Sequence, residues 1–145
     1  IRLIAMKKTF KLNNLNLMKN KNFTKMRKIV ENYKKFRTKL RNKIKFKIIK
    51  FMKQNETKSI LIYGAGIHAV YLRNLLIREF KKIDFLLDGN KSKKNQIFLS
   101  KKIKNIESLN NNKKYAVIIS SFSFENEIFE KVKKNKNLEV LRLYS

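Results

Sequence analysis

The chain has 145 residues, of which 43% are hydrophobic and 11% aromatic, enough for one domain with a real core. It contains no cysteine and one histidine, His68, which excludes disulfides, thiolate chemistry and metal sites built from cysteines or from several histidines. The formal net charge is +27, and residues 1–58 hold 20 of the 37 basic but only 2 of the 10 acidic side chains. The sequence therefore has a strongly basic N-terminal part and a more balanced remainder.

Residues 1–21 are rich in Asn and Lys and have weak periodicity, which predicts a poorly ordered tail. Apolar residues then recur at steps of three and four, and this spacing predicts a long basic amphipathic helix over residues 22–54, continuous or broken once. Residues 22–57 are thus expected to form a helical extension of a domain that begins at residue 58. The apolar stripe consists of Phe23, Met26, Val30, Tyr33, Phe36, Leu40, Ile44, Ile48 and Phe51.

Three partners are considered for this helix. The favoured one is the following domain or a second copy of the chain, packed through the stripe to give a homo-oligomer. The others are an anionic membrane surface and the phosphates of a nucleic acid. The aromatic residues lie on the stripe and do not alternate with the basic ones, which argues against a base-stacking platform. Without a targeting signal or a run long enough to span a bilayer, the expected location is cytoplasmic, with peripheral membrane attachment as an option.

From residue 58 short apolar runs alternate with helical segments. The runs predict buried strands at residues 59–63, 83–87, 115–120 and 138–143, with a short extended piece at 97–99. The segments between them predict helices at residues 67–78 and 124–135 and one helical turn at 106–109. This alternation predicts an α/β fold, with a parallel sheet covered by helices on both faces.

The sequence also predicts how single side chains of the two helices are placed. Ser123 is expected to cap the second helix, whose first turn holds Glu125 and Glu127 and whose last turn holds lysines, an order that suits the helix dipole. The residues expected to face the core from the first helical segment are Ile67, Val70, Tyr71, Leu75 and Phe80.

Two of the three glycines, Gly64 and Gly66, lie between the first predicted strand and its helix. With Ala69 they form the pattern G-x-G-x-x-A of nucleotide-binding βαβ units. There the first glycine makes a tight turn, the second leaves space for a pyrophosphate against the backbone, and the third small residue lets helix and strand pack closely. The helix N-terminus offers free N–H groups to the phosphates. The candidate phosphate loop comprises Gly64, Ala65, Gly66, Ile67, His68 and Ala69.

Asp88 follows the second predicted strand, 22 residues after Gly66, close to the spacing of about 20 at which an acidic side chain meets ribose hydroxyls. Lys91 and Lys93 could instead accept a 2′-phosphate that Asp88 would otherwise repel, so the base preference stays open. The expected ligands are a UDP-sugar or NAD(P). The competing interpretation is a strand-to-helix turn that needs small residues and binds nothing.

Three further residues are expected near this loop. His68 lies in the first turn of the helix, where it either bonds a phosphate or sugar or merely starts the helix, and nearby N–H groups should lower its pKa and keep it neutral. Ser120 and Ser121 end the third strand, on the edge where ligands bind in open parallel sheets. No base is paired with these serines, so a serine nucleophile is not expected. No catalytic residue and no metal ligand is assigned.

The segments IYGAGIHAVYL, FLLDGN and YAVIISSFSFENEIFEKV resemble the small Rossmann-like domain at the N-terminus of bacterial sugar acyltransferases, whose motif reads GAGGHA. Similar domains are attached to glycosyltransferases and sugar methyltransferases of surface-polysaccharide pathways. The resemblance covers residues 58–145. It implies a domain that binds the nucleotide part of a UDP-sugar through Gly64, Gly66, His68 and Asp88.

The chain also departs from that family. Ile67 stands where the family has a further glycine, which narrows the space above the loop. The acyltransferases carry their catalytic machinery in a following β-helix, which residues 58–145 do not contain, so catalysis by this chain alone is not expected.

The leading hypothesis is a nucleotide- or nucleotide-sugar-binding domain of polysaccharide or glycan biosynthesis, with a separate or fused transferase partner. The alternative from another class is a non-enzymatic interaction module whose basic helix binds an anionic membrane or nucleic acid. The third hypothesis is a fragment of an NAD(P)-dependent reductase, against which the lack of a substrate domain counts.

Overall fold

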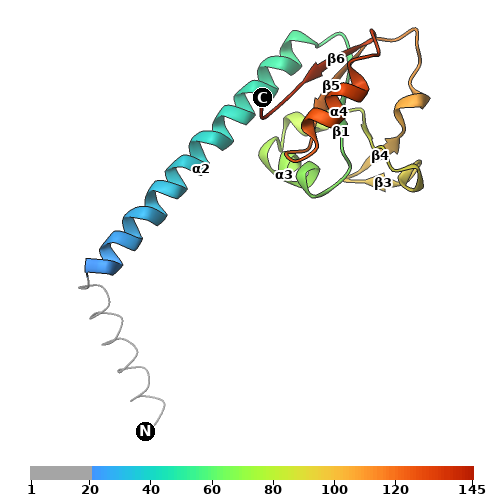
Figure 1. Ribbon diagram of the computed structural model, residues 1–145. Coiled ribbons are helices and arrows are strands. Elements are labelled where there is room, and N and C mark those ends of the chain that lie inside the picture. Colours follow the sequence, from blue (N-terminus) through green and yellow to red (C-terminus); the bar gives the residue numbers. More distant parts are fainter. Residues whose placement is uncertain (1–20) are drawn as a thin grey trace. The chain divides into compact units, whose positions relative to one another are not determined.

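The computed structural model describes residues 21–145, which contain a long N-terminal helix followed by a sheet with further helices (Figure 1). The predicted tail lies outside the described residues, apart from Lys21, which begins the helix. The chain divides into two units, residues 1–41 and 42–145. Among the described helices, none has both the length and the apolar character that crossing a membrane requires.

The long helix, α2, runs unbroken over Lys21–Gln54, which confirms the prediction of a basic helix there. Its apolar stripe has two different environments. From Ile44 onward the stripe is buried, and Ile48 has no exposed surface. From Phe23 to Leu40 the stripe side chains are exposed. The expectation that the stripe packs on the following domain therefore holds for its C-terminal part.

The sheet has six strands in the order β3-β4-β2-β1-β5-β6 (Figure 1). All neighbouring strands are parallel except β3, which pairs antiparallel with β4, so the predicted α/β fold with a parallel sheet is confirmed. The strands are β1 Ser59–Tyr63, β2 Phe85–Leu87, β3 Ile97–Phe98, β4 Lys101–Lys104, β5 Tyr115–Ile119 and β6 Leu138–Leu141. Strand β4 was not predicted, because only Ile103 of its four residues is apolar.

Two helices and three short 3-10 turns connect the strands: α3 Ile67–Leu75, η1 Glu79–Lys82, η2 Lys91–Lys93, η3 Ile106–Ser108 and α4 Glu125–Val132. The turn expected near residue 106 is confirmed as η3. The first helix was predicted too long, since α3 ends at Leu75 and the chain continues into η1. Ile67 was expected to face the core but is 91% exposed, because it is the first residue of α3 and points away from the sheet side that buries Leu72 and Leu75.

The predicted cap of the second helix is also corrected. Helix α4 begins at Glu125, and Ser123 makes no capping hydrogen bond there. Instead the hydroxyl of Ser121 accepts a hydrogen bond from the backbone N–H of Phe124 at 3.1 Å. The hydroxyl that closes this turn therefore comes from the loop after β5, three residues before Phe124.

Helices cover both faces of the sheet, as predicted. Along β1, Ile60 and Ile62 join the core cluster that contains Ile48 of α2 and Leu72 of α3. Leu61 and Tyr63 belong to a second cluster, which contains Val132 of α4. A strand buried on both faces reads as a continuous apolar run, which is why β1 and β5 were predictable. Because the chain leaves β1 toward β2 on one side and later returns to β5 on the other, the crossover direction changes beside β1, and this is where open parallel sheets bind ligands.

Candidate functional site

An open cleft with a volume of about 1030 Å³ lies where β1, β2 and β5 end. Three loops line it, after β1 at residues 64–68, after β2 at Asp88, Gly89 and Lys93, and after β5 at residues 120–124. Of the predicted site residues, the structure brings together at this cleft Gly64, Ala65, Gly66, Ile67, His68, Asp88, Ser120 and Ser121. Ala69 is fully buried and does not line the cleft. Ala69 is the third small residue of the motif, the one that lets helix and strand pack closely.

The conformation of Gly64 is one that only glycine adopts without strain. Its φ is +110°, and a Cβ at this position would lie 2.7 Å from the carbonyl oxygen of Ser120. The N–H of Gly64 donates to the carbonyl of Leu87 at 2.7 Å. Gly64 is therefore needed by the fold itself, because the loop after β1 passes directly against the end of β5.

Gly66 is different, because nothing in the protein requires it. It precedes α3 in an extended conformation, with φ −141° and ψ −163°, which any residue can adopt. A Cβ at Gly66 would meet no heavy atom within 4 Å. The glycine leaves open space beside the N-terminus of α3, where the first backbone N–H groups have no acceptor within the helix.

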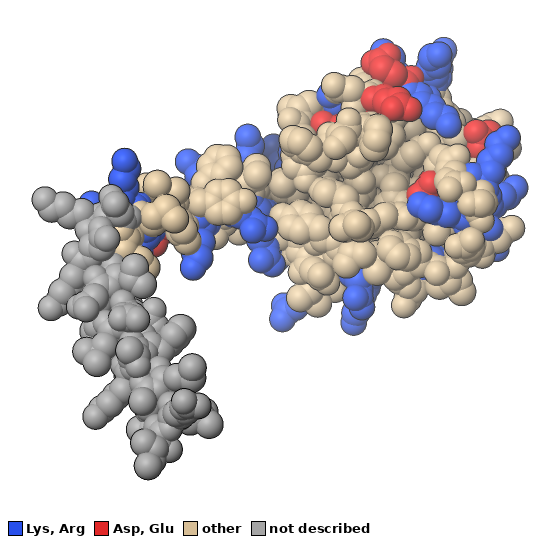
Figure 2. Space-filling view, turned by 60° about the horizontal axis from the view of Figure 1, so that its bottom comes forward, with Lys and Arg blue, Asp and Glu red and all other residues tan. Residues whose placement is uncertain are grey.

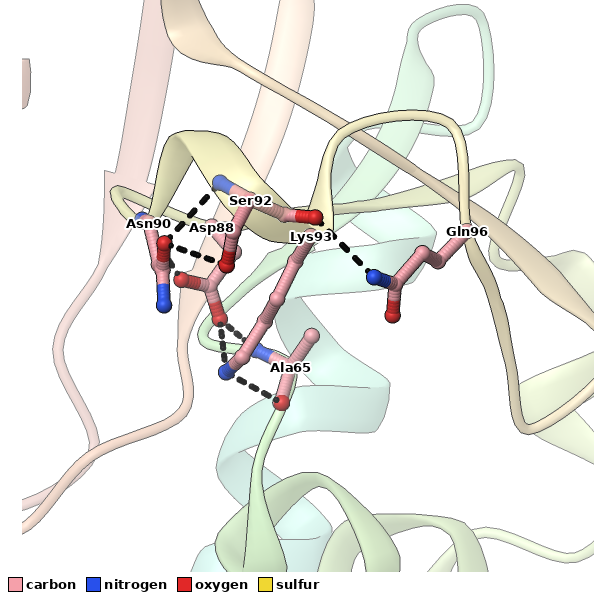
Figure 3. A network of polar contacts seen from close by, with 6 residues as sticks. All are labelled: Ala65, Asp88, Asn90, Ser92, Lys93 and Gln96. Carbon is pink, nitrogen blue, oxygen red and sulfur yellow. Dashed lines mark hydrogen bonds and ion pairs between the residues drawn. The ribbon is translucent and has the colours of Figure 1, made fainter.

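The carboxylate of Asp88 fastens the glycine loop to the end of β2 (Figure 3). Its Oδ2 accepts hydrogen bonds from the N–H of Ala65 at 3.0 Å and from Nζ of Lys93 at 2.9 Å, and its Oδ1 accepts from the N–H of Asn90 at 2.8 Å. Burial alone would raise the pKa of Asp88, but the donors on Asn90, Lys93 and Ala65 outweigh it and hold the pKa below its ordinary 3.8. Asp88 is therefore an anion that organises the loop.

The ammonium of Lys93 is fixed in the same network. It bonds Asp88 and also the carbonyl of Ala65 at 3.1 Å. The side chain of Asn90 accepts from the N–H and the hydroxyl of Ser92, and Gln96 donates to the carbonyl of Ser92, so the turn that carries Lys93 is held at both ends (Figure 3). Lys93 thus compensates the charge of Asp88 at the cleft, whereas Lys91 does not line it.

The expected role of Asp88 on a ribose diol stays a prediction. Its Oδ2 accepts two hydrogen bonds from the protein. Its Oδ1 accepts one, and a carboxylate oxygen has lone pairs for a second donor. A loop-organising role and a ligand-binding role are therefore compatible in the same side chain.

His68 lines the cleft and contacts two hydroxyl groups, one at each ring nitrogen. Its Nδ1 lies 3.0 Å from the Ser120 hydroxyl, and its Nε2 bonds the hydroxyl of Tyr144. Burial lowers the pKa of His68, and the charge of Glu125 offsets part of this shift. The lowered pKa agrees with the neutral imidazole expected from the sequence, but its main cause is burial and not the N–H groups of the helix. Burial, with Tyr71 and Glu125 nearby, also raises the pKa of Tyr144 to about 12.

Glu125 places Tyr144 beside His68. The Glu125 carboxylate is buried in the first turn of α4 and accepts hydrogen bonds from the backbone N–H groups of Leu143 and Tyr144, the latter at 3.0 Å. Its second oxygen lies 3.7 Å from Nε of Arg142. From the sequence, Glu125 was expected only to interact with the helix dipole. Its pairing with a segment near residue 144 depends on tertiary structure, and no local pattern signals it.

Exposed apolar side chains border the cleft, and of these only Ile67 was among the predicted site residues, whereas Phe122 and Phe124 were not. Phe122 is 71% exposed, Phe124 61% and Ile67 91%, and all three line the cleft. The ring of Phe122 packs edge-on against Tyr144, with 5.0 Å between ring centroids. Such side chains beside a polar loop offer a flat apolar contact to a ring-shaped ligand or to another domain.

Comparison with known proteins identifies the family of this chain. No curated protein and no solved structure matches the chain. A family model described as the C-methyltransferase C-terminal domain matches residues 3–140, which include all of α2 and most of the α/β unit. This agrees with the methyltransferase part of the sequence resemblance and leaves its acyltransferase part as an expectation. The chain therefore belongs to the family of C-methyltransferase C-terminal domains.

Proposed function

We propose that this domain binds a nucleotide, most specifically a nucleotide sugar, in the cleft at the ends of β1, β2 and β5. In this role it presents the sugar to a fused or separate methyltransferase of polysaccharide or glycan biosynthesis. The pyrophosphate lies over Gly66 and the N-terminus of α3. The base or the sugar ring lies against the apolar side chains Phe122 and Phe124.

The observation that carries the proposal is the difference between the two glycines. Gly64 is explained by the protein, through its positive φ and the carbonyl of Ser120. Gly66 has an ordinary backbone conformation and open space around it. A glycine costs conformational entropy on folding, so its presence there is accounted for by a ligand that must touch the backbone, as a pyrophosphate does in βαβ units.

The charges around the cleft support the same ligand. The Asp88 carboxylate is paired with Lys93 at 2.9 Å, so its charge is compensated where a phosphate would approach. The first N–H groups of α3 and the positive end of its dipole then favour an anion. The family supports the proposed link to a methyltransferase. A C-methyltransferase adds a methyl group to a carbon atom of its substrate, and a nucleotide sugar offers such carbon atoms together with a diphosphate that the cleft can bind.

The test is thermal unfolding of the full chain with a panel of UDP-, dTDP- and GDP-sugars, NAD, NADP and inorganic pyrophosphate. A ligand that binds only the folded state raises the melting temperature. We expect a nucleotide sugar to give the largest rise. Gly66→Val should abolish it while changing the stability of the unliganded protein by less than about 1 kcal/mol, because the added side chain enters open space.

Gly64→Ala is the matched control. It should destabilise the unliganded protein by at least about 1–3 kcal/mol, since alanine is strained at positive φ and its Cβ would meet the Ser120 carbonyl. A panel in which no nucleotide raises the melting temperature, or a Gly66→Val variant that binds as well as the wild type, would overturn the proposal. A rise in melting temperature with NAD or NADP alone would mean that the cleft is the binding site but that its ligand is a dinucleotide and not a nucleotide sugar.

A further inference from the structure

The N-terminal part of α2 carries an exposed apolar face. Over residues 23–40 its large apolar side chains are between 39% and 65% exposed. This face, called here the N-terminal apolar face, consists of Phe23, Met26, Ile29, Val30, Tyr33, Phe36 and Leu40. Contiguous exposed apolar surface of this kind usually marks a site of interaction.

The width of this face narrows the choice of partner. At 100° per residue, its seven members fall within an arc of about 140° on the helix surface. A two-stranded coiled coil uses a narrower seam, formed by two positions of each heptad. The only charged residue well inside the arc is Arg37, whose guanidinium lies 5.8 Å from the ring centroid of Tyr33. A continuous broad face is typical of helices that lie on a lipid surface.

The rest of the helix surface is cationic. Residues 21–41 contain nine Lys or Arg and a single acidic residue, Glu31, which is paired with Arg27 at 3.0 Å. In Figure 2 the blue groups of this part of α2 stand on both sides of a tan strip. Two copies packed through the apolar face would bring these like charges together, which disfavours a homodimer. An anionic surface is attracted to them instead.

A nucleic acid would contact the basic side chains of the helix but not its apolar face. Phosphates would pair with the lysines and arginines, but the apolar face would stay in water, because its aromatic residues are grouped and not interleaved with the basic ones. A bilayer interface accommodates both properties. The apolar side chains enter the acyl boundary, and the long Lys and Arg side chains reach the headgroup phosphates.

From these observations we propose that residues 21–41 bind the surface of an anionic lipid bilayer, with the N-terminal apolar face inserted and the basic flanks on the headgroups. The occupant of the face is lipid. This attachment is independent of ligand binding at the cleft, which belongs to residues 42–145. It holds the α/β unit beside a membrane, where glycans carried on lipids would be within reach.

The sharpest test uses tryptophan, which the chain lacks. In the full chain, Tyr33→Trp places a single indole at the centre of the apolar face. Vesicles of phosphatidylcholine mixed with phosphatidylglycerol should shift its emission to the blue, and brominated acyl chains should quench it. The matched control is Phe46→Trp, at a residue of α2 that is 71% exposed but belongs to the basic side of the helix. It should respond weakly or not at all.

Two sets of substitutions separate the two components of binding in vesicle sedimentation. The apolar variant Val30→Asn/Tyr33→Asn should lower the affinity for anionic vesicles at least about tenfold, because less apolar surface inserts. The basic variant Lys28→Glu/Lys35→Glu/Lys39→Glu should lower it at least about a hundredfold and make it insensitive to salt. The charge-matched control is Lys102→Glu/Lys134→Glu/Lys136→Glu, at exposed residues of the α/β unit, which should bind like the wild type.

Each other outcome identifies a different occupant and overturns the proposal. Equal blue shifts at residues 33 and 46 would mean that no face inserts. A concentration-dependent dimer in sedimentation equilibrium, broken by the apolar variant and present without vesicles, would make a second copy the occupant. Tight binding to RNA that the apolar variant leaves unchanged, without binding to anionic vesicles, would assign the helix to nucleic acid. Because the apolar and the basic variants are substituted outside residues 42–145, an unchanged melting temperature of the α/β unit shows that their loss of binding is not loss of folding.

Discussion

The two parts of α2 have the same apolar spacing and opposite environments. In residues 42–54, Ile44 and Ile48 are buried in the core cluster that also holds Ile60 and Ile62 of β1. In residues 23–40 the equivalent positions, such as Val30, are about half exposed. Periodicity identifies which side of a helix is apolar, but not what covers it. The first part of the stripe contributes to folding, and the second is available for binding, so substitutions should have different consequences in the two parts.

Core truncation should show the largest difference. Ile48→Ala removes buried methylene groups from a side chain with no exposed surface and should lower the free energy of unfolding by about 2–5 kcal/mol. Val30→Ala, in the exposed part of the same helix, should change it by less than about 0.5 kcal/mol. Urea denaturation of the full chain, followed by tyrosine fluorescence, measures both. Equal losses of stability in the two variants would mean that the side chain of Val30 is also buried in solution, and the distinction between the two parts of α2 would be wrong.

Ion pairs extend the comparison to polar groups. Glu125 is 5% exposed at its side chain, beside Arg142 and the N–H groups of Leu143 and Tyr144, whereas Glu31 is 52% exposed beside Arg27. Glu125→Gln should cost about 1–3 kcal/mol, because buried donors lose a charged acceptor. Glu31→Gln should cost less than about 0.5 kcal/mol, the usual value of an exposed pair one helical turn apart.

The measurement for this pair is again the free energy of unfolding, with a second readout at Tyr144. If Glu125 positions the C-terminal segment, Glu125→Gln should also expose Tyr144 and lower its phenolic pKa from about 12 toward the ordinary 10.0. Spectrophotometric titration of the tyrosines detects this change, and Glu31→Gln should leave the titration curve unaltered. A Glu125→Gln variant with unchanged stability and titration would show that Arg142 and the segment after β6 hold their places without this carboxylate.

The elements that sequence analysis predicted well are those whose signal is local. Strands β1 and β5 are continuous apolar runs because both of their faces are buried, and α2 has a long uninterrupted period. The β3–β4 hairpin was missed because its loop residues Leu99 and Ser100 adopt positive φ angles of 52° and 60°. Positive φ angles at both loop residues are usually signalled by Asn-Gly or Asp-Gly. Helix α3 was predicted too long because the apolar pattern continues to Phe80 through a 3-10 turn.

The candidate site divides in the same way. The glycine loop, Asp88 and the serines after β5 were predictable because strand ends of a parallel sheet meet at one edge. Tyr144 was not, because it reaches His68 across 76 residues of sequence. The sequence also did not show that the fold requires glycine at Gly64 but not at Gly66, since this depends on where the carbonyl of Ser120 lies. Packing between distant segments decides such details, and a single sequence does not encode it in any local pattern.

The smallest expected effect concerns His68, the only histidine of the chain. The exposed part of α2 therefore has no imidazole, and the α/β unit alone should show histidine-dependent stability. Burial holds the pKa of folded His68 below its ordinary 6.5. As the pH falls below 6.5 the unfolded chain takes up a proton before the folded protein does, so stability should fall, by at most about 1.4 kcal/mol per pH unit. The loss should end once the pH is below the lowered pKa, and above pH 6.5 His68 should contribute no slope.

Unfolding curves collected between neutral pH and the range where carboxylates begin to titrate measure this slope, and the single imidazole resonance in a proton NMR titration gives the pKa of His68 directly. His68→Asn should remove the slope and leave the loss that Asp88 contributes below its ordinary pKa of 3.8, because the lowered pKa of Asp88 acts in the same direction at lower pH. The Ser120 and Tyr144 hydroxyls contact the two ring nitrogens, and burial lowers the pKa of the ring, so we expect the imidazole resonance to titrate below 6.5. An imidazole that titrates at 6.5 or above would mean that water reaches it in solution, and the buried arrangement of Ser120, His68 and Tyr144 would then be wrong.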